Sequence, residues 1–382
     1  MRCAFRSANA HLSHWKTSAN FAEPLDFFGQ NHYANNMSAS MHGSDCDAMN
    51  WEGLAIKQLR IGLLIVLLAA AGVLLWIAAG RRESAREAAS SAVSQQIVYT
   101  GECTVMGELA EQKAAGPGAE EAIQAAAAAL QEIERSWSPD RPDSAASRIA
   151  ADAGIRATVL DEEEYALLER GIALSAESGG LFDVTAAPVA ALWADGEPSA
   201  DQIGSALSLV GYGQAQLDPE ARSILLPRPG AAVDLSGILW GYAAGRLLEI
   251  YEQADLQGAR ASFGGVQILY GELEEGVPLT AEIRDGEGTA LGTITGSRTV
   301  AVTQNGPVLD PGTGMPAETD LVSVTVLAED PVYADYLADV ICAAGTEGLP
   351  AHLTEAYGVV AEDEAGTLYV SDSLDGVFTP AE

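Results

Sequence analysis

The C-terminal body of this 382-residue chain is nearly free of histidine and lysine. Four of the five histidines lie within the first fifty residues, so that only His352 follows, and Lys113 is the only lysine after residue 60. A Ser-His-Asp triad, a histidine-rich zinc site and a P-loop lysine are therefore excluded from the body. Carboxylates, hydroxyls, backbone amides and eleven arginines remain. Oxygen donors of this kind favour a hard cation such as Mg²⁺.

Basic residues and paired cysteines are scarce in the whole chain. Twenty Lys and Arg against 54 Asp and Glu give a net charge of −34. Such a chain repels phosphate backbones, and no basic patch with interleaved aromatics offsets this charge, which argues against nucleic-acid binding. The acidity itself indicates a solvated surface. The spacing of the four cysteines matches no metal knuckle, and we expect Cys103 and Cys342 to be buried thiols. A disulfide between them is the alternative outside the cytoplasm.

One long apolar run interrupts the N-terminal part of the chain. Residues 61–80 read IGLLIVLLAAAGVLLWIAAG without a charge, which as a helix spans about 30 Å, the thickness of the hydrocarbon core of a bilayer. The run predicts a single transmembrane helix. Basic residues flank it on both sides, so that the charges do not determine its orientation. Neither a small-residue cleavage site nor a lipid-attachment cysteine follows, which favours an uncleaved anchor.

The composition changes along the chain and predicts five segments. The first 48 residues hold most of the histidines and no periodic apolar pattern, and Met49 opens an ordinary lead into the apolar run. We expect Met49 to be the native start. The predicted segments are a disordered or non-native leader (1–48), a short cytoplasmic segment (49–60), the transmembrane helix (61–80), a linker (81–96) and a C-terminal domain (97–382).

The C-terminal domain combines helical and strand patterns without a regular βαβ alternation, which is typical of the α+β class. Helices are expected over residues 119–137, 162–178, 200–209, 241–253 and 331–344. Strands are expected over residues 97–103, 221–226, 231–235, 266–270, 279–283 and 322–327, and near Ala261.

Two motifs in the first half of this domain begin or end predicted helices. The first, SGGLFDVTAAPVAALW (178–193), ends a helix at two glycines, and Asp183 and Thr185 are suited to bond nearby backbone. On its own it is a turn. The second, DLSGILWGYAAGRL (234–247), leads through a glycine into a helix. Helix N-termini expose unpaired amides, and this one suits a phosphate or diphosphate, with an ordinary strand-to-helix turn as the alternative.

Two further motifs carry carboxylates. The third, VLDPGTGMPAE (308–318), has Asp310 at its head, and a tight turn capped by that side chain is the simplest interpretation. The fourth places Asp335 and Asp339 four residues apart on a predicted helix, so that both carboxylates point from one face. An exposed acidic face is the default interpretation in so acidic a chain, and a bridging cation is the alternative.

In this order the four motifs resemble those of the FAD:protein FMN transferase (ApbE) family, over about residues 97–382. Thr104–Gly107 is similar to the family's TxMG turn, and Ser144 and Arg148 are similar to its DSxxSR region. The resemblance implies a T-fold-like α+β domain that binds FAD with Mg²⁺. It also implies transfer of FMN to a Thr or Ser hydroxyl of a target flavoprotein subunit, with release of AMP, outside the cytoplasm.

The resemblance also assigns roles to individual residues. It implies that Asp310 is catalytic, and that the metal ligands are the backbone oxygen of Gly237 and the side chains of Asp335 and Asp339. The residues that it places at the flavin and adenine are Met106, Trp137, Leu192, Trp193, Ala194, Asp234 and Trp240.

Several positions depart from the family's pattern. Trp240 stands where many members have Lys, and Pro307 stands where a His is usual. Asp339 takes the place of a Thr, and the segment before the third motif is reduced to residues 303–306. These departures leave a second hypothesis open, a non-catalytic relative at the membrane that binds flavin or a partner protein.

Overall fold

The structure is a computed structural model that describes residues 4–5, 97–194, 196–353 and 357–381. The predicted leader, apart from residues 4–5, and the cytoplasmic segment, transmembrane helix and linker lie outside the described residues. Within the described ranges, no helix is both long and apolar enough to span a bilayer. The predicted anchor at 61–80 therefore stays a prediction.

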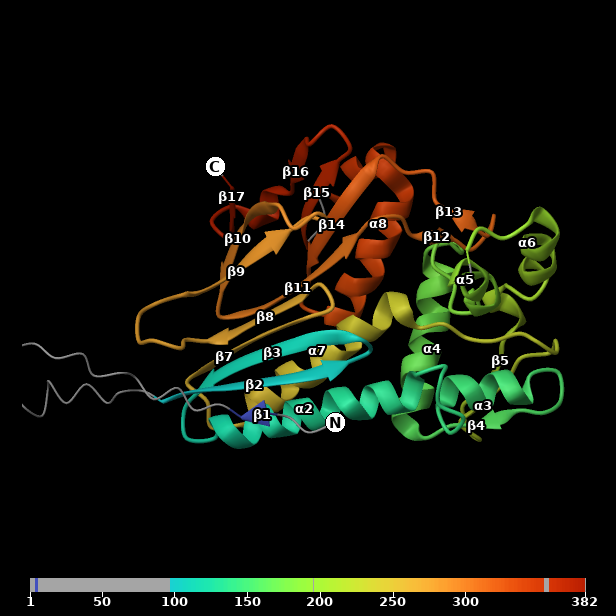
Figure 1. Ribbon diagram of the computed structural model, residues 1–382, viewed down its shortest axis with the longest axis horizontal. Helices are drawn as coiled ribbons and strands as arrows, with labels where there is room; N and C mark the ends of the chain where they lie inside the picture. The colour runs from blue at the N-terminus through green and yellow to red at the C-terminus, as the bar shows by residue number, and fades with distance from the viewer. Residues whose placement is uncertain (1–3, 6–96, 195, 354–356, 382) are drawn as a thin grey trace, which may run out of the picture. The chain divides into compact units, whose positions relative to one another are not determined.

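A nine-stranded sheet forms the centre of the domain, and all of its neighbouring strands are antiparallel (Figure 1). In sheet order its strands are β1 (Ala4–Phe5), β2 (Val98–Val105), β3 (Glu108–Ala115), β7 (Gly258–Phe263), β8 (Val266–Gly271), β11 (Arg298–Asn305), β14 (Leu321–Leu327), β15 (Gly358–Asp363) and β16 (Leu368–Val370). Met106 and Gly107 connect β2 to β3 with φ of 49° and 84°, as a two-residue hairpin turn requires.

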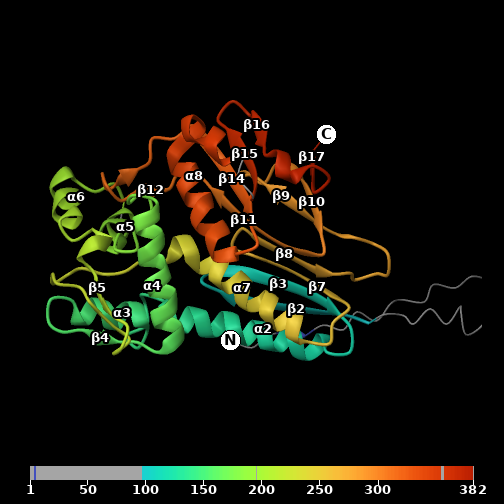
Figure 2. The same ribbon diagram turned by 180° about the vertical axis from the view of Figure 1, so that it is seen from behind.

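The two faces of the sheet are covered differently. Three helices, α2 (Ala119–Trp137), α7 (Ser236–Gln253) and α8 (Pro331–His352), pack on one face (Figure 2). The other face carries a three-stranded sheet of β17 (Phe378–Pro380), β10 (Ala290–Gly296) and β9 (Leu279–Arg284). Successive residues follow this division, because Ile268 belongs to the core under the helices and Leu269 to the core under the small sheet.

The chain between α2 and α7 forms a lobe beside the helices (Figures 1 and 2). It consists of α3 (Ala145–Asp152), α4 (Glu162–Glu177), α5 (Ala187–Ala194), α6 (Ala200–Leu207) and the sheet of β4 (Thr158–Val159), β6 (Ser223–Leu225) and β5 (Gln216–Asp218). Two 3₁₀ turns, Tyr212–Gln214 and Asp372–Leu374, and the short hairpin of β12 (Leu309–Asp310) and β13 (Met315–Pro316) complete the described elements.

The predicted α+β class is confirmed, and α2 has the predicted bounds. The strand predicted over 231–235 is wrong, because this segment pairs with no strand among the described residues and the N–H of Asp234 donates to the carbonyl of Val184. The helix predicted from Gly241 begins earlier, at Ser236. Gly241 marks a close contact rather than a helix start, since a Cβ there would overlap the carbonyl oxygen of Pro331 in α8.

Both body cysteines are buried thiols, as expected, and no disulfide joins them. Cys103 lies in β2 and Cys342 in α8. Burial raises the pKa of the Cys342 thiol to about 11. Such a thiol is unreactive at neutral pH.

Candidate functional site

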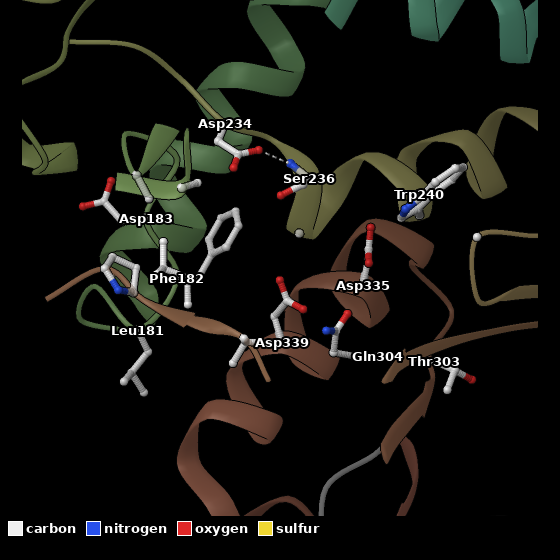
Figure 3. Close-up of a pocket in the computed structure, with 17 residues that line it drawn as sticks. Leu181, Phe182, Asp183, Asp234, Ser236, Trp240, Thr303, Gln304, Asp335 and Asp339 are labelled. Carbon is white, nitrogen blue, oxygen red and sulfur yellow. Dashed lines mark hydrogen bonds between the residues drawn. The ribbon is translucent and has the colours of Figure 1, made fainter. Parts of the chain in front are cut away.

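A pocket of about 320 Å³ lies between the N-terminal turn of α7 and α8, beside the end of β11 and the loop after α4 (Figure 3). This volume is at the lower end of the range for ligand pockets. Five of the predicted site residues line it: Asp234, Gly237, Trp240, Asp335 and Asp339. The other lining residues are Leu181, Phe182, Asp183, Ala186, Ala190, Ser236, Gly264, Thr303, Gln304, Val308, Leu309 and Pro311. Each of the four motifs therefore contributes residues to the lining of this pocket.

The loop of the first motif is held rigidly at the pocket. Gly179 and Gly180 end α4 with φ of 65° and 93°. The carboxylate of Asp183 then accepts hydrogen bonds from the backbone N–H and hydroxyl of Thr185, at 2.8 and 2.6 Å, and from the N–H of Tyr212 at 3.0 Å. The predicted backbone bonding by Asp183 is thus confirmed. Because three donors already serve it, this carboxylate is a structural part of the wall.

The second motif places α7 with its first turn at the pocket. The N–H of Asp234 donates to Val184 at 2.7 Å, which ties the segment before α7 to the first motif. The carboxylate of Asp234 accepts the N–H of Ser236 at 2.9 Å. One of the amides that this N-terminus offers to an anion is therefore already engaged by an acidic side chain of the same chain.

Asp335 and Asp339 extend from α8 toward the first turns of α7 (Figure 3). Asp335 is buried, and its carboxylate accepts the backbone N–H of Gly241 at 2.7 Å. Asp339 is partly buried, and none of the described residues donates a hydrogen bond to its carboxylate. The default interpretation of an exposed acidic face is therefore wrong, and the two carboxylates face the pocket instead.

The surroundings of these carboxylates penalise their negative charge. Burial raises the pKa of Asp335 well above its usual range, and the charge of Asp339 raises it further, against backbone hydrogen bonds from Gly241 and Trp240. Burial, with a contribution from Asp234, raises the pKa of Asp339 to about 7. A cation between the carboxylates would favour their charged forms. A positively charged ligand would therefore be stabilised between Asp335 and Asp339.

The donor set fits a magnesium ion. No group of three or more His, Cys, Asp or Glu side chains within the described ranges is placed to hold a metal, so further ligands must be carbonyls, hydroxyls or water, which Mg²⁺ accepts. Gly237 lies directly opposite, because a Cβ there would overlap Oδ2 of Asp339. In a regular helix the carbonyl of Gly237 would accept the N–H of Gly241. Here that N–H donates to Asp335, so the carboxylate competes with the carbonyl of Gly237 for it.

Trp240 forms the wall beside Asp335. Its half-buried ring lies against the turn between β7 and β8, where a Cβ at Gly264 would come within 2.6 Å of the indole. The rings of Trp240 and Phe263 are tilted by 46° with centroids 5.9 Å apart. The backbone turn and the neighbouring ring therefore fix the position of the indole at the pocket.

Asp310 is the last residue of β12, at the start of the turn to β13. Its carboxylate accepts the N–H of Gly312 at 2.8 Å and the hydroxyl of Thr313 at 2.8 Å, which is the predicted capped turn. Its neighbours Leu309 and Pro311 line the pocket, whereas Asp310 does not. The catalytic role that the resemblance implies for Asp310 stays a prediction.

Five other predicted site residues are not among the residues that line the pocket. Met106 occupies the turn between β2 and β3, and Trp137 is buried in the main core at the end of α2. Leu192, Trp193 and Ala194 end α5, and the indole N–H of Trp193 donates to the carbonyl of Gly314 at 3.0 Å. The flavin contacts that the resemblance implies for them stay predictions.

Sequence reasoning missed several lining residues. Phe182 lies in the first motif, which was interpreted as a turn, and Ser236 lies in the second motif. Thr303 and Gln304 lie at the end of β11, in the segment where the sequence departs from the family. No strand was predicted over 298–305, and the contact between β11 and α8, which places the end of this strand at the pocket, is tertiary.

Solved structures share this fold. The ApbE protein of Thermotoga maritima matches with a TM-score of 0.66 and 22% identity, over 75% of this chain and 100% of that one. The flavinyl transferase ApbE of Pseudomonas stutzeri, in its apo form, matches with a TM-score of 0.67 and 22% identity, over 75% of this chain and 98% of that one. The chain is thus an α+β protein with the fold of these structures.

Sequence relatives give the same result. The FAD:protein FMN transferase of Treponema pallidum (strain Nichols) is 29% identical over 264 residues, 60% of this chain and 73% of the relative. That of Haemophilus influenzae is 26% identical over 238 residues, 55% of this chain and 69% of the relative. The sequence profile described as the ApbE family matches residues 101–361. The chain therefore belongs to the ApbE family, and the resemblance seen in the motifs is confirmed.

Proposed function

We propose that the chain is a FAD:protein FMN transferase that depends on Mg²⁺. Membership of the family and the names of the relatives support this activity. The observation that carries the proposal is the pair of carboxylates, Asp335 and Asp339, directed from α8 into a pocket opposite Gly237. Transfer of a phosphoryl group from a diphosphate is assisted by a hard cation beside the reacting phosphorus, and this pair of carboxylates offers a place for one.

In the proposed reaction a Thr or Ser hydroxyl of the acceptor protein attacks the phosphorus on the flavin side of FAD. A bond forms between the hydroxyl oxygen and this phosphorus, the bond to the bridging oxygen breaks, AMP leaves, and the hydroxyl proton is released. Asp335 and Asp339, with the carbonyl of Gly237, would hold Mg²⁺, which supplies neutralisation of the diphosphate charge. Trp240 and Phe182 offer apolar walls to the rings of the substrate.

The test is incubation of the full chain with FAD, MgCl₂ and an acceptor protein that carries an exposed Thr or Ser. AMP release together with an acceptor mass increase of one FMN unit supports the transferase. Asp335→Ala is expected to abolish both products, because it removes one of the two carboxylates. AMP release by Asp335→Ala at the wild-type rate would remove Asp335 from the site.

The second hypothesis, a non-catalytic flavin-binding relative, predicts a different outcome. The absence of Lys, Arg and His among the described residues that line the pocket favours it, because no charged donor stands ready for the leaving phosphate. In that case FAD binds and is recovered intact after incubation with Mg²⁺ and acceptor. A chain that neither binds nor cleaves FAD would exclude the transferase and the flavin binder, and would leave the form of the second hypothesis in which the chain binds a partner protein.

We also propose that residues 61–80 anchor the domain to the membrane, with residues 97–382 outside the cytoplasm. The uncharged twenty-residue run supports the anchor, and the family resemblance supports the orientation. Alkaline extraction should leave the chain in the membrane pellet, and protease added to the outer face should degrade residues 97–382. Release into the supernatant, or protection of the domain, would contradict the anchor or the orientation, respectively.

A further inference from the structure

The pocket is acidic on several sides, and no basic side chain among the described lining residues balances this charge. Four of its lining residues are aspartates, Asp183, Asp234, Asp335 and Asp339, and no Lys, Arg or His of the described residues lines it. The body's single histidine, His352, lies at the end of α8, where its Nδ1 is 2.7 Å from the hydroxyl of Tyr357. An anion that enters this pocket therefore meets carboxylates and neutral groups only.

The positive end of α7 does not offset this charge. The N–H of Ser236 at the start of the helix is taken by the carboxylate of Asp234, at 2.9 Å. An acidic group at a helix N-terminus already satisfies the partial positive charge of that end. One of the amide groups that would otherwise attract a diphosphate, that of Ser236, thus has a carboxylate of the chain itself as its partner.

Trp240 is the largest of the three α7 residues that line the pocket, after Ser236 and Gly237. It is fixed there by Gly264 and Phe263, and its indole contributes a ring face and a neutral N–H. Repulsion between like charges is several times stronger at a protein site than in water. A bare diphosphate, with its two negative charges, is therefore disfavoured here, although the flavin and adenine rings find apolar surface.

We propose that this pocket accepts the diphosphate of a dinucleotide only together with a divalent cation, and that the neutral Trp240 sets this requirement. This inference rests on the proposed function, since the dinucleotide is FAD. It goes beyond a cation needed for the chemical step, because the cation becomes a condition of binding. Riboflavin, which has the ring system without the phosphates, is expected to bind equally with and without the cation.

The test measures equilibrium binding of FAD to the full chain by fluorescence anisotropy, in MgCl₂ and in EDTA. For the wild type the affinity is expected to fall about a hundredfold or more in EDTA. Trp240→Lys places a cation in the wall, and its loss in EDTA is expected to be under about tenfold. Trp240→Met, a neutral side chain of similar length, is the matched control and should keep the wild-type dependence. Thermal unfolding shows whether each variant is folded.

The outcomes separate this inference from the proposed function. Wild-type chain that binds FAD equally tightly in EDTA overturns the inference and leaves the transferase standing. Equal rescue by Trp240→Met and Trp240→Lys overturns the role of charge at this position. FAD that binds in neither condition overturns the proposed function together with the inference. Should the Trp240 variants not fold, the wild-type comparison of FAD with riboflavin still decides the cation requirement.

Discussion

At the scale of single residues, Gly237 and Gly245 make a matched pair within α7. A Cβ at Gly237 would overlap the carboxylate of Asp339, whereas nothing lies within 4 Å of the position that a Cβ at Gly245 would take. Gly237→Ala is therefore expected to displace Asp339 and to reduce FAD cleavage by about a hundredfold or more, as small misplacements of catalytic groups do. The measurement is AMP release at saturating FAD and Mg²⁺.

Gly245→Ala is the control for that change. Alanine in a helix interior is favoured over glycine by about 0.5–1 kcal/mol, so this variant should keep wild-type AMP release and unfold at a slightly higher temperature. Similar losses of activity in both variants would show that the helix, rather than the contact between Gly237 and Asp339, carries the effect.

The carboxylate of Asp339 makes metal-free stability dependent on pH. Burial and Asp234 raise its pKa from 3.8 to about 7, so the folded chain binds a proton that the unfolded chain has released. Stability is then lost as pH rises from about 4 to about 7. In EDTA, Asp339→Asn should flatten this dependence and gain roughly 1–3 kcal/mol over the wild type at pH 8.

Urea unfolding across this pH range measures the difference between the two chains. Glu329→Gln, at an exposed position just before α8, removes the same charge and should leave the pH dependence unchanged. Mg²⁺ should also raise wild-type stability and leave that of Asp339→Asn nearly unchanged, because a ligand that binds only the folded state stabilises it. An identical pH dependence in wild type and Asp339→Asn would contradict the raised pKa.

At the scale of elements, the start of α4 depends on one buried carboxylate. Glu164 accepts from the guanidinium of Arg148 in α3, with its two oxygens at 2.9 and 2.7 Å from Nη2, and from the N–H of Asp161 at 3.0 Å. Asp161 in turn accepts the N–H of Glu164 at 2.8 Å. This capping box and ion pair join α3 to α4 and thereby fix the lobe that carries the first motif.

Glu164→Gln should lower the free energy of unfolding by about 1–3 kcal/mol, because a charged hydrogen bond of a largely buried group is lost. Glu162→Gln lies in the same helical turn, and the side chain of Glu162 is 88% exposed at 3.5 Å from Arg222. Exposed pairs contribute little, so this control should change stability by less than about 0.5 kcal/mol. Urea unfolding of both variants gives the comparison.

The elements that the sequence predicts well are those with strong periodicity. The apolar spacing of Ala119–Trp137 gave α2 its bounds, and the alternation of β14 was predicted to within one residue. The start of α7 was missed, because Gly237 and Gly241 weaken a helical pattern and serve contacts with α8 that only the fold reveals. The strand predicted over 231–235 is wrong, since an apolar pattern does not show which partners the backbone groups of a segment bond.

The candidate site was predictable in its chemistry and less so in its contacts. The scarcity of His and Lys and the spacing of Asp335 and Asp339 indicated oxygen ligands. In the structure both carboxylates line the pocket. The pair alone left open whether the carboxylates face water. The packing of α7 on α8 decides this, because Gly241 both touches Pro331 and donates to Asp335. Family position also predicted Trp193 at the site, but in the structure Trp193 does not line the pocket, and its indole N–H donates to the carbonyl of Gly314.

At the scale of the whole molecule, the chain carries a net charge of −34, and we propose that its pocket requires a divalent cation. A strongly negative protein concentrates cations near its surface, and salt screens this attraction, with a Debye length of about 30 Å at 0.01 M falling to about 8 Å at 0.15 M. Raising KCl over this range should therefore increase the Mg²⁺ concentration for half-maximal FAD binding by roughly three- to tenfold.

Affinity for FAD at saturating Mg²⁺ should change much less over the same range, because the magnesium complex of the diphosphate carries little net charge. The measurement is a Mg²⁺ titration of FAD anisotropy at fixed FAD, repeated at each KCl concentration, with sucrose of equal osmolality as the control for effects other than screening. A half-saturating Mg²⁺ concentration that does not move with KCl would show that cation binding depends on the immediate contacts of Asp335 and Asp339. Equal weakening of FAD binding at saturating Mg²⁺ would instead show that the dinucleotide itself enters as the charged species.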